Sequence, residues 1–334
     1  MSTARPPSRV ARRPRQARVR RRILAGVGIV ALVGVVLALQ PSPPVGHWRS
    51  AAGQDDFGRD YDRAMAELPT PTETHDLRTD FGIVRMYRFA GTAEQPTTSP
   101  FLLLPGRGAS TPMWAGFLER LLPLGDVYAV DLLGEPGRSI QERPVTNAAD
   151  QAAWLDQALA QLPPDQFHVL GLSIGGWTAA NLAVHRPEPV ASLTLLDPVF
   201  TVADLRPEVI VRSLPAVLPW MPKAWRDDFN AWTAGGESSE GELVAAMLES
   251  GQKNYRTSLP APTRITEDQL GRLDMPVLLV LGGASVMHDA AKAEQVARRA
   301  MPHAVVKVHP GGSHAVGLQE PDLVVTELTR LIRR

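Results

Sequence analysis

A short apolar run, a glycine-flanked serine and a helical pattern follow one another at residues 167–185, and this succession constrains the fold more than any other stretch. The serine is Ser173, with Gly171 and Gly175 two residues to either side. A strand that turns sharply into a helix requires glycine there, because side chains would collide with the neighbouring strand and helix. Such a turn strains the backbone of Ser173 and exposes its hydroxyl, as a nucleophile requires. The alternative interpretation is a serine that only caps the following helix.

The composition excludes several classes of site and partner. The 334 residues are enough for one large domain or two ordinary ones, and 44% of them are hydrophobic, which rules out wholesale disorder. There is no cysteine, so disulfides, a thiolate nucleophile and cysteine-ligated zinc are impossible. Residues 1–22 contain nine Arg and no acidic residue, which leaves 26 basic against 35 acidic residues in the remainder. This acidic body argues against nucleic acid as a partner.

The N-terminal part of the chain has the pattern of a membrane anchor. Residues 1–22 form a basic, proline-containing leader that we expect to be disordered. The run from Ile23 to Leu39 is uncharged, and as a helix it would span about 25 Å, close to the hydrocarbon thickness of a bilayer. We therefore expect a transmembrane signal anchor over 23–40. The flanking Arg residues predict an N-terminus in the cytoplasm.

This anchor would make a single-pass membrane protein whose folded body lies outside the cytoplasm. The alternative is export with cleavage of the segment as a signal peptide, for which Ser50-Ala51-Ala52 could serve. The junction at residues 20–24 also resembles a twin-arginine export signal. Residues 41–70 are interpreted as a proline-rich linker followed by a short helical piece.

From about residue 71 onward, strand patterns and helix patterns alternate. Most predicted strands are apolar throughout, which is typical of a parallel sheet covered by helices on both faces. The first two, separated by Gly82, predict an antiparallel pair instead. We expect strands at 74–81, 83–90, 100–104, 126–131, 167–170, 190–196, 276–281 and 304–308, and helices at 111–122, 147–162, 176–185, 289–300 and 321–332. The predicted fold class is α/β, with a mostly parallel sheet of eight strands.

Four segments of the body together resemble the α/β-hydrolase fold superfamily over about residues 71–334. They are Leu104–Gly108, Asp131–Ser139, the turn at 171–175 and Gly311–His314, in the order that the superfamily has them. The resemblance implies a helical cap inserted after the sixth strand, at about 199–272. It also implies that a nucleophile, an acid and a histidine meet at the carboxyl edge of the sheet, in that chain order.

The resemblance carries over to particular residues of this chain. Ser173 matches the nucleophile, and His314, on the loop after the last strand, matches the general base. The oxyanion hole would use the backbone N–H groups of Ile174 and Arg107. For the Arg107 side chain, a solvated loop position and a substrate contact are both open.

The acid is where the sequence departs from the superfamily's pattern. Relatives usually have Asp shortly after the seventh strand, where this chain has Ser285. Asp197 at the end of the sixth strand and Asp289 beyond Ser285 are the two substitutes. We favour Asp197, because a strand end holds a carboxylate more rigidly than a helix start, although Asp197 could also cap the loop before Pro198. Asp289 is expected to cap its helix, and Asp131 is expected to be structural.

These observations predict a serine hydrolase of the carboxylesterase or lipase type. It would cleave a carboxylic ester of a small molecule or lipid through an acyl-Ser173 intermediate, without an organic cofactor or a metal. A second interpretation keeps the fold and changes the bond: peptidase, thioesterase, carbon–carbon bond hydrolase or haloperoxidase. A third is a non-catalytic binding protein that has lost the acid. The oligomeric state and the acyl and alcohol groups of the substrate are not encoded in any pattern that we can interpret.

Overall fold

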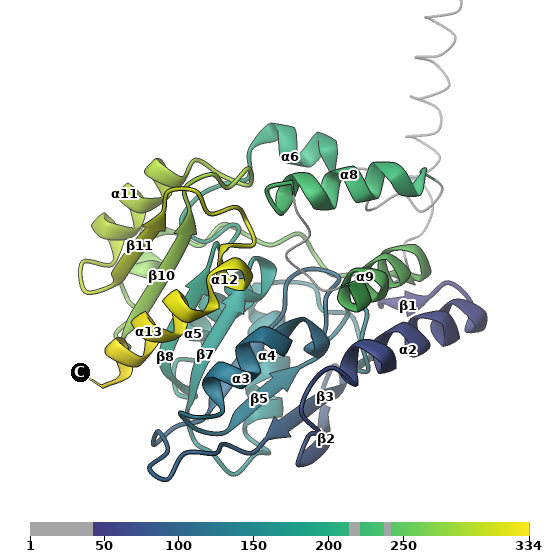
Figure 1. Ribbon diagram of the computed structural model, residues 1–334, viewed down its shortest axis with the longest axis horizontal. Helices are drawn as coiled ribbons and strands as arrows, with labels where there is room; N and C mark the ends of the chain where they lie inside the picture. The colour runs from purple at the N-terminus through teal and green to yellow at the C-terminus, as the bar shows by residue number, and fades with distance from the viewer. Residues whose placement is uncertain (1–42, 214–220, 237–241, 334) are drawn as a thin grey trace, which may run out of the picture. The chain divides into compact units, whose positions relative to one another are not determined.

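A twisted, mostly parallel sheet forms the centre of the protein (Figure 1). The computed structural model describes residues 43–213, 221–236 and 242–333. In this part of the chain, eight strands lie in the order β11-β10-β8-β7-β4-β5-β3-β2, and a two-residue strand, β6, pairs with β3. The strands are β2 (Glu73–Thr79), β3 (Gly82–Phe89), β4 (Phe101–Leu104), β5 (Val127–Val130), β6 (Ile140–Gln141), β7 (Phe167–Leu172), β8 (Val190–Leu196), β10 (Val277–Gly282) and β11 (Val305–His309).

The pairing of the strands confirms the predicted fold class. β2 and β3 are antiparallel, β3 is antiparallel to β5, and the six strands from β5 to β11 along the sheet are parallel to their neighbours. In the parallel part, Leu172 at the end of β7 is in register with Leu196 at the end of β8. Gly282 at the end of β10 is likewise in register with His309 at the end of β11. Segments that follow these strands therefore emerge together at one edge of the sheet.

Helices cover both faces of this sheet. Successive residues of a strand point to opposite faces, and Leu102 and Leu103 of β4 accordingly belong to two different apolar clusters. One cluster includes residues of α4 (Ala148–Leu159), α5 (Ile174–His185) and α11 (Ala290–Ala300). The other includes residues of α3 (Ala115–Leu121) and α13 (Pro321–Ile332). Two short helices, η1 (Thr111–Trp114) and α12 (Val316–Gln319), precede α3 and α13.

The chain leaves the sheet between β8 and β10 and forms a helical cap. Its described elements are α6 (Pro207–Arg212), α8 (Lys223–Thr233), α9 (Glu242–Asn254), β9 (Tyr255–Arg256) and α10 (Glu267–Leu270). Arg226 of α8 binds Glu249 of α9 with two hydrogen bonds, of 2.6 and 3.1 Å, and is almost fully buried. The insertion lies where the sequence predicted a cap, after the sixth strand of the main sheet.

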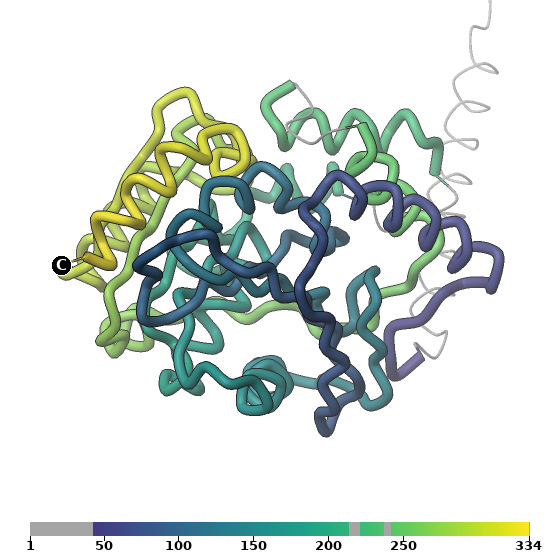
Figure 2. The backbone as a smooth tube through the Cα atoms, turned by 60° about the horizontal axis from the view of Figure 1, so that its bottom comes forward, coloured from purple at the N-terminus to yellow at the C-terminus, as the bar shows by residue number. Residues whose placement is uncertain are grey.

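A proline-rich linker followed by a short helical piece was expected over 41–70, and the described part of this segment contains a short strand and a helix. β1 (His47–Trp48) pairs with β9 of the cap, and α2 (Ala51–Met65) packs against α9 (Figure 2). The side chain of Ser50 caps α2 by accepting the N–H of Gly53 at 3.0 Å. Phe57 and Tyr61, one turn apart on α2, are each 1% exposed. This apolar stripe holds the arm, which consists of β1 and α2, against the rest of the protein, because exposing the two aromatic side chains to water would be unfavourable.

The expectations for residues 1–22 and 23–40 fall outside the residues that the structure describes. None of the helices within the described ranges is long and apolar enough to cross a membrane.

Candidate active site

Ser173 lies in the turn between β7 and α5, in a backbone conformation that few non-glycine residues adopt. Its φ is +56° and its ψ is −115°. The flanking glycines explain how the turn closes. A Cβ atom at Gly171 would collide with the carbonyl oxygen of Gly175, and one at Gly175 would collide with that of Leu104. The predicted steric need for both glycines is therefore confirmed, and the turn presents the Ser173 hydroxyl at the carboxyl edge of the sheet.

His314 is held beside Ser173 by the loop that follows β11. Its Nε2 lies 2.8 Å from Ser173 Oγ, and its side chain is 14% exposed. The preceding residue anchors this loop, because the backbone N–H and the hydroxyl of Ser313 both donate to Gln319 of α12, at 3.3 and 2.9 Å. Gln319 in turn donates to the carbonyl of Ala234 in the cap at 3.1 Å. The histidine loop is thus connected to both the body and the cap.

Asp197 completes a continuous line of polar contacts with these two residues. It follows β8, has a φ of +41°, and is 0% exposed. Its Oδ2 lies 2.6 Å from His314 Nδ1, so Nδ1 carries the proton and the Nε2 lone pair faces the Ser173 hydroxyl. The structure therefore brings Ser173, His314 and Asp197 together. This juxtaposition depends on the adjacency of β7, β8, β10 and β11 in the sheet.

The environment of Asp197 favours its ionised form. Burial by itself raises the pKa of this carboxyl, but the close approach of the His288 and His314 imidazoles outweighs burial and brings the pKa below its usual range. Two further donors contribute, since the N–H of Gly282 donates to Oδ1 at 2.9 Å and the Ser285 hydroxyl donates to Oδ2 at 2.7 Å. An ionised Asp197 can fix the histidine tautomer and stabilise an imidazolium.

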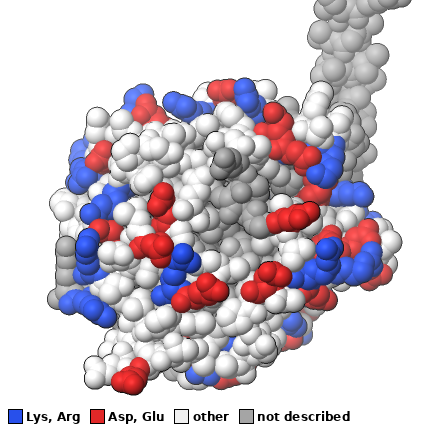
Figure 3. Space-filling model, viewed as in Figure 1, with Lys and Arg blue, Asp and Glu red and all other residues white. Residues whose placement is uncertain are grey.

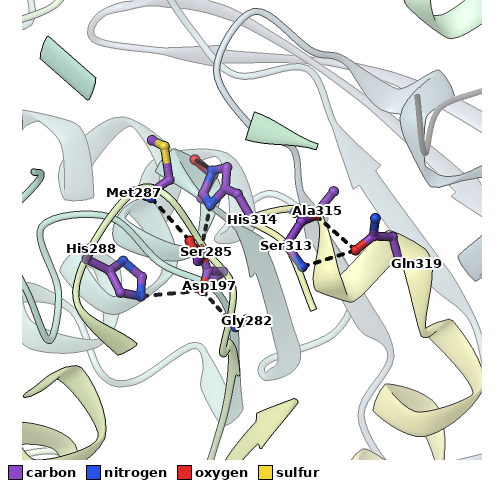
Figure 4. A network of polar contacts seen from close by, with 10 residues as sticks. Asp197, Gly282, Ser285, Met287, His288, Ser313, His314, Ala315 and Gln319 are labelled. Carbon is purple, nitrogen blue, oxygen red and sulfur yellow. Dashed lines mark hydrogen bonds and ion pairs between the residues drawn. The ribbon is translucent and has the colours of Figure 1, made fainter. Parts of the chain in front are cut away.

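The turn after β10 supplies partners that the sequence did not reveal (Figure 4). Ser285 occupies the position where relatives have the acid, and its hydroxyl contacts the acid from the neighbouring strand instead. His288 is 1% exposed, and its Nε2 lies 3.4 Å from Asp197 Oδ1, longer than an ordinary hydrogen bond. The alternative acid, Asp289, caps α11 by accepting the N–H of Lys292 at 3.1 Å. Its carboxylate is therefore committed to the helix end.

The expected oxyanion donors lie on two segments that face Ser173. Ile174 is the first residue of α5, where a helix leaves its N–H without an intrahelical acceptor. Arg107 lies in the loop after β4, where a Cβ atom built on the adjacent Gly106 would be 3.9 Å from Ser173 Cβ. The amides on either side of Arg107 are engaged, that of Gly106 with Met113 Sδ at 3.4 Å and that of Gly108 with Glu135 Oε2 at 3.2 Å.

Glu135 holds the Arg107 loop in place, a role that no pattern in the sequence indicated. The carboxylate is 2% exposed, and besides the Gly108 N–H it binds Arg107 Nη1 at 3.1 Å. The Arg107 side chain is itself half exposed. A narrow cavity of about 10 Å³, room for about one water molecule, lies beside these residues. Its walls include Leu133, Ile174, Trp177, Leu259 and Pro260.

Charged side chains of both signs are mixed on the surface. Figure 3 shows basic and acidic side chains interspersed over the face seen in Figure 1. Exposed ion pairs of the protein include Arg120 with Asp322 and Arg299 with Glu267. Within the described residues, no cluster of three or more His, Asp or Glu side chains is arranged to hold a metal ion.

The fold and the site define a hydrolase of the serine type. Residues 101–327 match the alpha/beta hydrolase family, and the chain belongs to that family. Carboxylesterase YbfK of Bacillus subtilis (strain 168) is 25% identical over 276 residues, which cover 80% of this chain and 90% of that enzyme. The uncharacterized carboxylesterase nap of the same organism is 24% identical over 277 residues, or 81% of this chain and 90% of that one. The crystal structure of naproxen esterase (carboxylesterase NP) from Bacillus subtilis superposes with a TM-score of 0.76 at 22% identity, covering 84% of this chain and 99% of that one.

Proposed function

We propose that the protein hydrolyses carboxylic esters through an acyl intermediate on Ser173. The observation that carries this proposal is the unbroken line from Ser173 Oγ to His314 Nε2 at 2.8 Å and from His314 Nδ1 to Asp197 Oδ2 at 2.6 Å. The ester as the substrate class is supported by the relatives, two of which are named carboxylesterases. The contact of Asp197 with His314 supports Asp197 as the acid where the chain has Ser285, and so favours a catalytic protein over a non-catalytic binding protein.

In the first half of the reaction, His314 Nε2 takes the proton of the Ser173 hydroxyl as its oxygen attacks the ester carbonyl carbon. The negative charge that develops on the carbonyl oxygen is stabilised by the N–H groups of Ile174 and Arg107. The imidazolium then gives its proton to the departing alkoxide, and the alcohol leaves. Asp197 keeps its negative charge throughout and stabilises the imidazolium.

In the second half, water attacks the acyl-Ser173 carbonyl while His314 takes one of its protons. The tetrahedral intermediate collapses, the carboxylic acid leaves, and the proton returns to Ser173 Oγ. The residues beside the oxyanion donor Ile174 are largely apolar, among them Leu133, Trp177 and Leu259. Apolar surroundings favour an apolar group of the ester over a charged one, which supports a lipophilic ester as the substrate.

The proposal also includes attachment to a membrane through residues 23–40, with the catalytic domain outside the cytoplasm. Support comes from the sequence alone, namely the uncharged run from Ile23 to Leu39 preceded by nine Arg. We expect the mature protein to have the mass of the full chain and to remain in the membrane fraction after a carbonate wash. A mass that lacks the first 40 or more residues would instead establish cleavage and export.

The test of the function is hydrolysis of p-nitrophenyl esters of increasing acyl length by the full-length protein in mild detergent. We expect turnover that favours short to medium chains and disappears in Ser173→Ala. A fluorophosphonate probe should label the wild type and not the variant. Absence of both turnover and labelling in the folded protein would contradict the proposal. Labelling without ester turnover would retain the nucleophile and reassign the bond that is cleaved.

A further inference from the structure

The carboxylate of Asp197 is surrounded by more donors than a histidine alone would need. Both oxygens are buried, and each faces two donor groups: Oδ2 faces His314 and Ser285, and Oδ1 faces the N–H of Gly282 and His288. An ionised carboxylate has about four lone-pair sites. Three groups donate hydrogen bonds to Asp197, and His288 faces it from 3.4 Å without a hydrogen bond. Three of these four groups belong to the single turn at 282–288 (Figure 4). The turn therefore contacts both oxygens of the acid and shares Oδ2 with His314.

Ser285 shares one carboxylate oxygen with the histidine. Its hydroxyl donates to Oδ2 at 2.7 Å, and His314 Nδ1 lies 2.6 Å from the same atom. The N–H of Met287 donates to Ser285 Oγ at 3.3 Å, which fixes the direction of the hydroxyl toward Asp197. A donor on Oδ2 withdraws negative charge from the atom that stabilises the imidazolium. Ser285 and His314 therefore compete for the charge on the same oxygen of Asp197.

His288 is a buried imidazole that the reaction as described does not use. Neither of its ring nitrogens has a hydrogen-bond partner among the described residues, and the side chain is 1% exposed. Its Nε2 points at Asp197 Oδ1 from 3.4 Å. A polar group buried without a partner destabilises the fold. This loss of stability is explained if the His288 ring acts on the Asp197 carboxylate that it faces.

We propose that Ser285 and His288 are positioning residues that act through Asp197 and lower the proton affinity of His314. This inference rests on the proposed function, because it assigns to the pair a control over the same general base. Ser285 contacts Oδ2 of the carboxylate and His288 faces Oδ1. Both groups attract negative charge that would otherwise act on His314. The result is a histidine that remains unprotonated, and hence active as a base, at lower pH than it would beside an unshared carboxylate.

Other charged groups near Asp197 contact partners outside this network. Asp289, next to His288, accepts the N–H of Lys292 at 3.1 Å. Arg206 approaches the same stretch through its backbone, whose N–H donates to the carbonyl of Met287 at 2.8 Å, and its charge acts on Asp289. On the far side of the turn, His309 pairs with Glu320 at 3.7 Å. Asp197 is thus the charge that His288 and His314 have in common.

The test is the acid limb of the pH profile of kcat/KM in four variants of the full-length protein. Ser285→Ala and His288→Leu remove the donors, whereas Ser285→Thr and His288→Gln keep one. We expect the midpoint of the acid limb to move to higher pH by about 0.5 to 1 unit in Ser285→Ala and His288→Leu. In Ser285→Thr and His288→Gln, the midpoint should return toward the wild-type value. KM should change by less than about threefold, since none of these residues lines the narrow cavity beside Ile174. His303→Leu, at an exposed position, is the matched control and should leave the midpoint of the acid limb unchanged.

A substrate-free measurement separates this inference from the proposed function. The protonation midpoint of His314 is followed by the NMR signal of its Nδ1 proton, in a Ser173→Ala background with and without each substitution. An upward shift of the midpoint supports the inference even if the enzyme cleaves another bond. An unmoved or lowered midpoint in both Ser285→Ala and His288→Leu would overturn it and leave a merely structural turn. Loss of ester turnover in the wild type bears only on the proposed function.

Discussion

Two aspartates end parallel strands of the same sheet, and both are wholly buried, yet their surroundings differ. Asp131 follows β5 and Asp197 follows β8, and each is 0% exposed. Asp131 accepts from the N–H and hydroxyl of Thr111 on η1, at 2.9 and 2.8 Å, and from the N–H of Arg138 at 2.8 Å, and it faces the Tyr61 hydroxyl. Asp197 accepts from backbone and serine too, but it also faces two imidazoles. Asp131 therefore faces donors that do not become cations, whereas Asp197 faces two groups that can carry positive charge.

The pKa values of the two carboxyls move in opposite directions. Burial raises the pKa of Asp131, and its neutral donors do not fully compensate. Burial acts in the same sense on Asp197, but the histidines outweigh it and the pKa falls. Burial at a strand end therefore does not make an aspartate catalytic. The difference lies in whether a partner can carry the complementary positive charge.

The largest expected effect follows from Asp197→Asn. The amide cannot hold the histidine tautomer or stabilise the imidazolium, so kcat should fall by about 10³- to 10⁴-fold. The measurement is ester turnover per folded molecule, with the folded fraction taken from circular dichroism. A fall of less than tenfold would show that the acid lies elsewhere or that Ser173 and His314 suffice.

Asp131→Asn is the matched variant for this comparison. Its turnover per folded molecule should stay within about threefold of the wild type. Its free energy of unfolding should fall by about 1–3 kcal/mol, because an amide NH₂ would face the N–H of Arg138. If this variant lost activity as Asp197→Asn does, the distinction between the two strand ends would fail.

The middle-sized effect is a difference in how stability depends on pH. Asp197 has a lowered folded pKa, so its contribution is present above the unfolded value of about 3.9 and is lost as pH falls through the folded value. Asp131 has a raised folded pKa, so the native state gains relative stability as pH falls through that value. On acidification, the gap in unfolding free energy from the wild type should close for Asp197→Asn and widen for Asp131→Asn. Denaturant titrations between pH 7 and the acid limit of folding measure both gaps, and gaps that change in the same direction on acidification would contradict the assignment.

The smallest effect is expected for Asp289→Ala. This carboxylate caps α11 at the surface, where its pKa is lowered by the N–H of Lys292. Its removal should lower the melting temperature slightly and leave kcat and the pH profile unchanged. A loss of turnover as large as that of Asp197→Asn would return Asp289 to consideration as the acid.

Much of this architecture was predictable from local patterns. Apolar runs of strand length and the glycines at 171 and 175 encode the strands and the turn within a few residues of sequence, and the observed bounds agree closely. The placement of Asp197 was harder, because its contact with His314 depends on strand order and joins residues far apart in the chain. Asp197 and Asp289 were both candidates in the sequence, and their three-dimensional neighbours distinguish them.

Other features depended on partners that no local window contains. Ser285 and His288 stand in an ordinary loop sequence, and their role depends on a carboxylate contributed by β8. Residues 41–70 were interpreted as a proline-rich linker followed by a short helical piece. The stripe of Phe57 and Tyr61 was visible at helical spacing, but its partner, α9, lies in the cap. The position of this segment depends on burial against residues far away in the chain, and not on local helix propensity.

The pairing of β1 with β9 has a consequence for how the chain acquires its structure. Trp48 and His47 are among the first described residues, and their partners, Tyr255 and Arg256, come after most of the sheet and cap. During synthesis, the arm has nothing to pair with until the ribosome has passed that point. Closure of such a distant contact belongs to the last stage of folding, since the entropy of a long loop opposes it. Until then, the side of α2 that packs against α9 lacks its partner, whereas the contact of Tyr61 with β3 can already form.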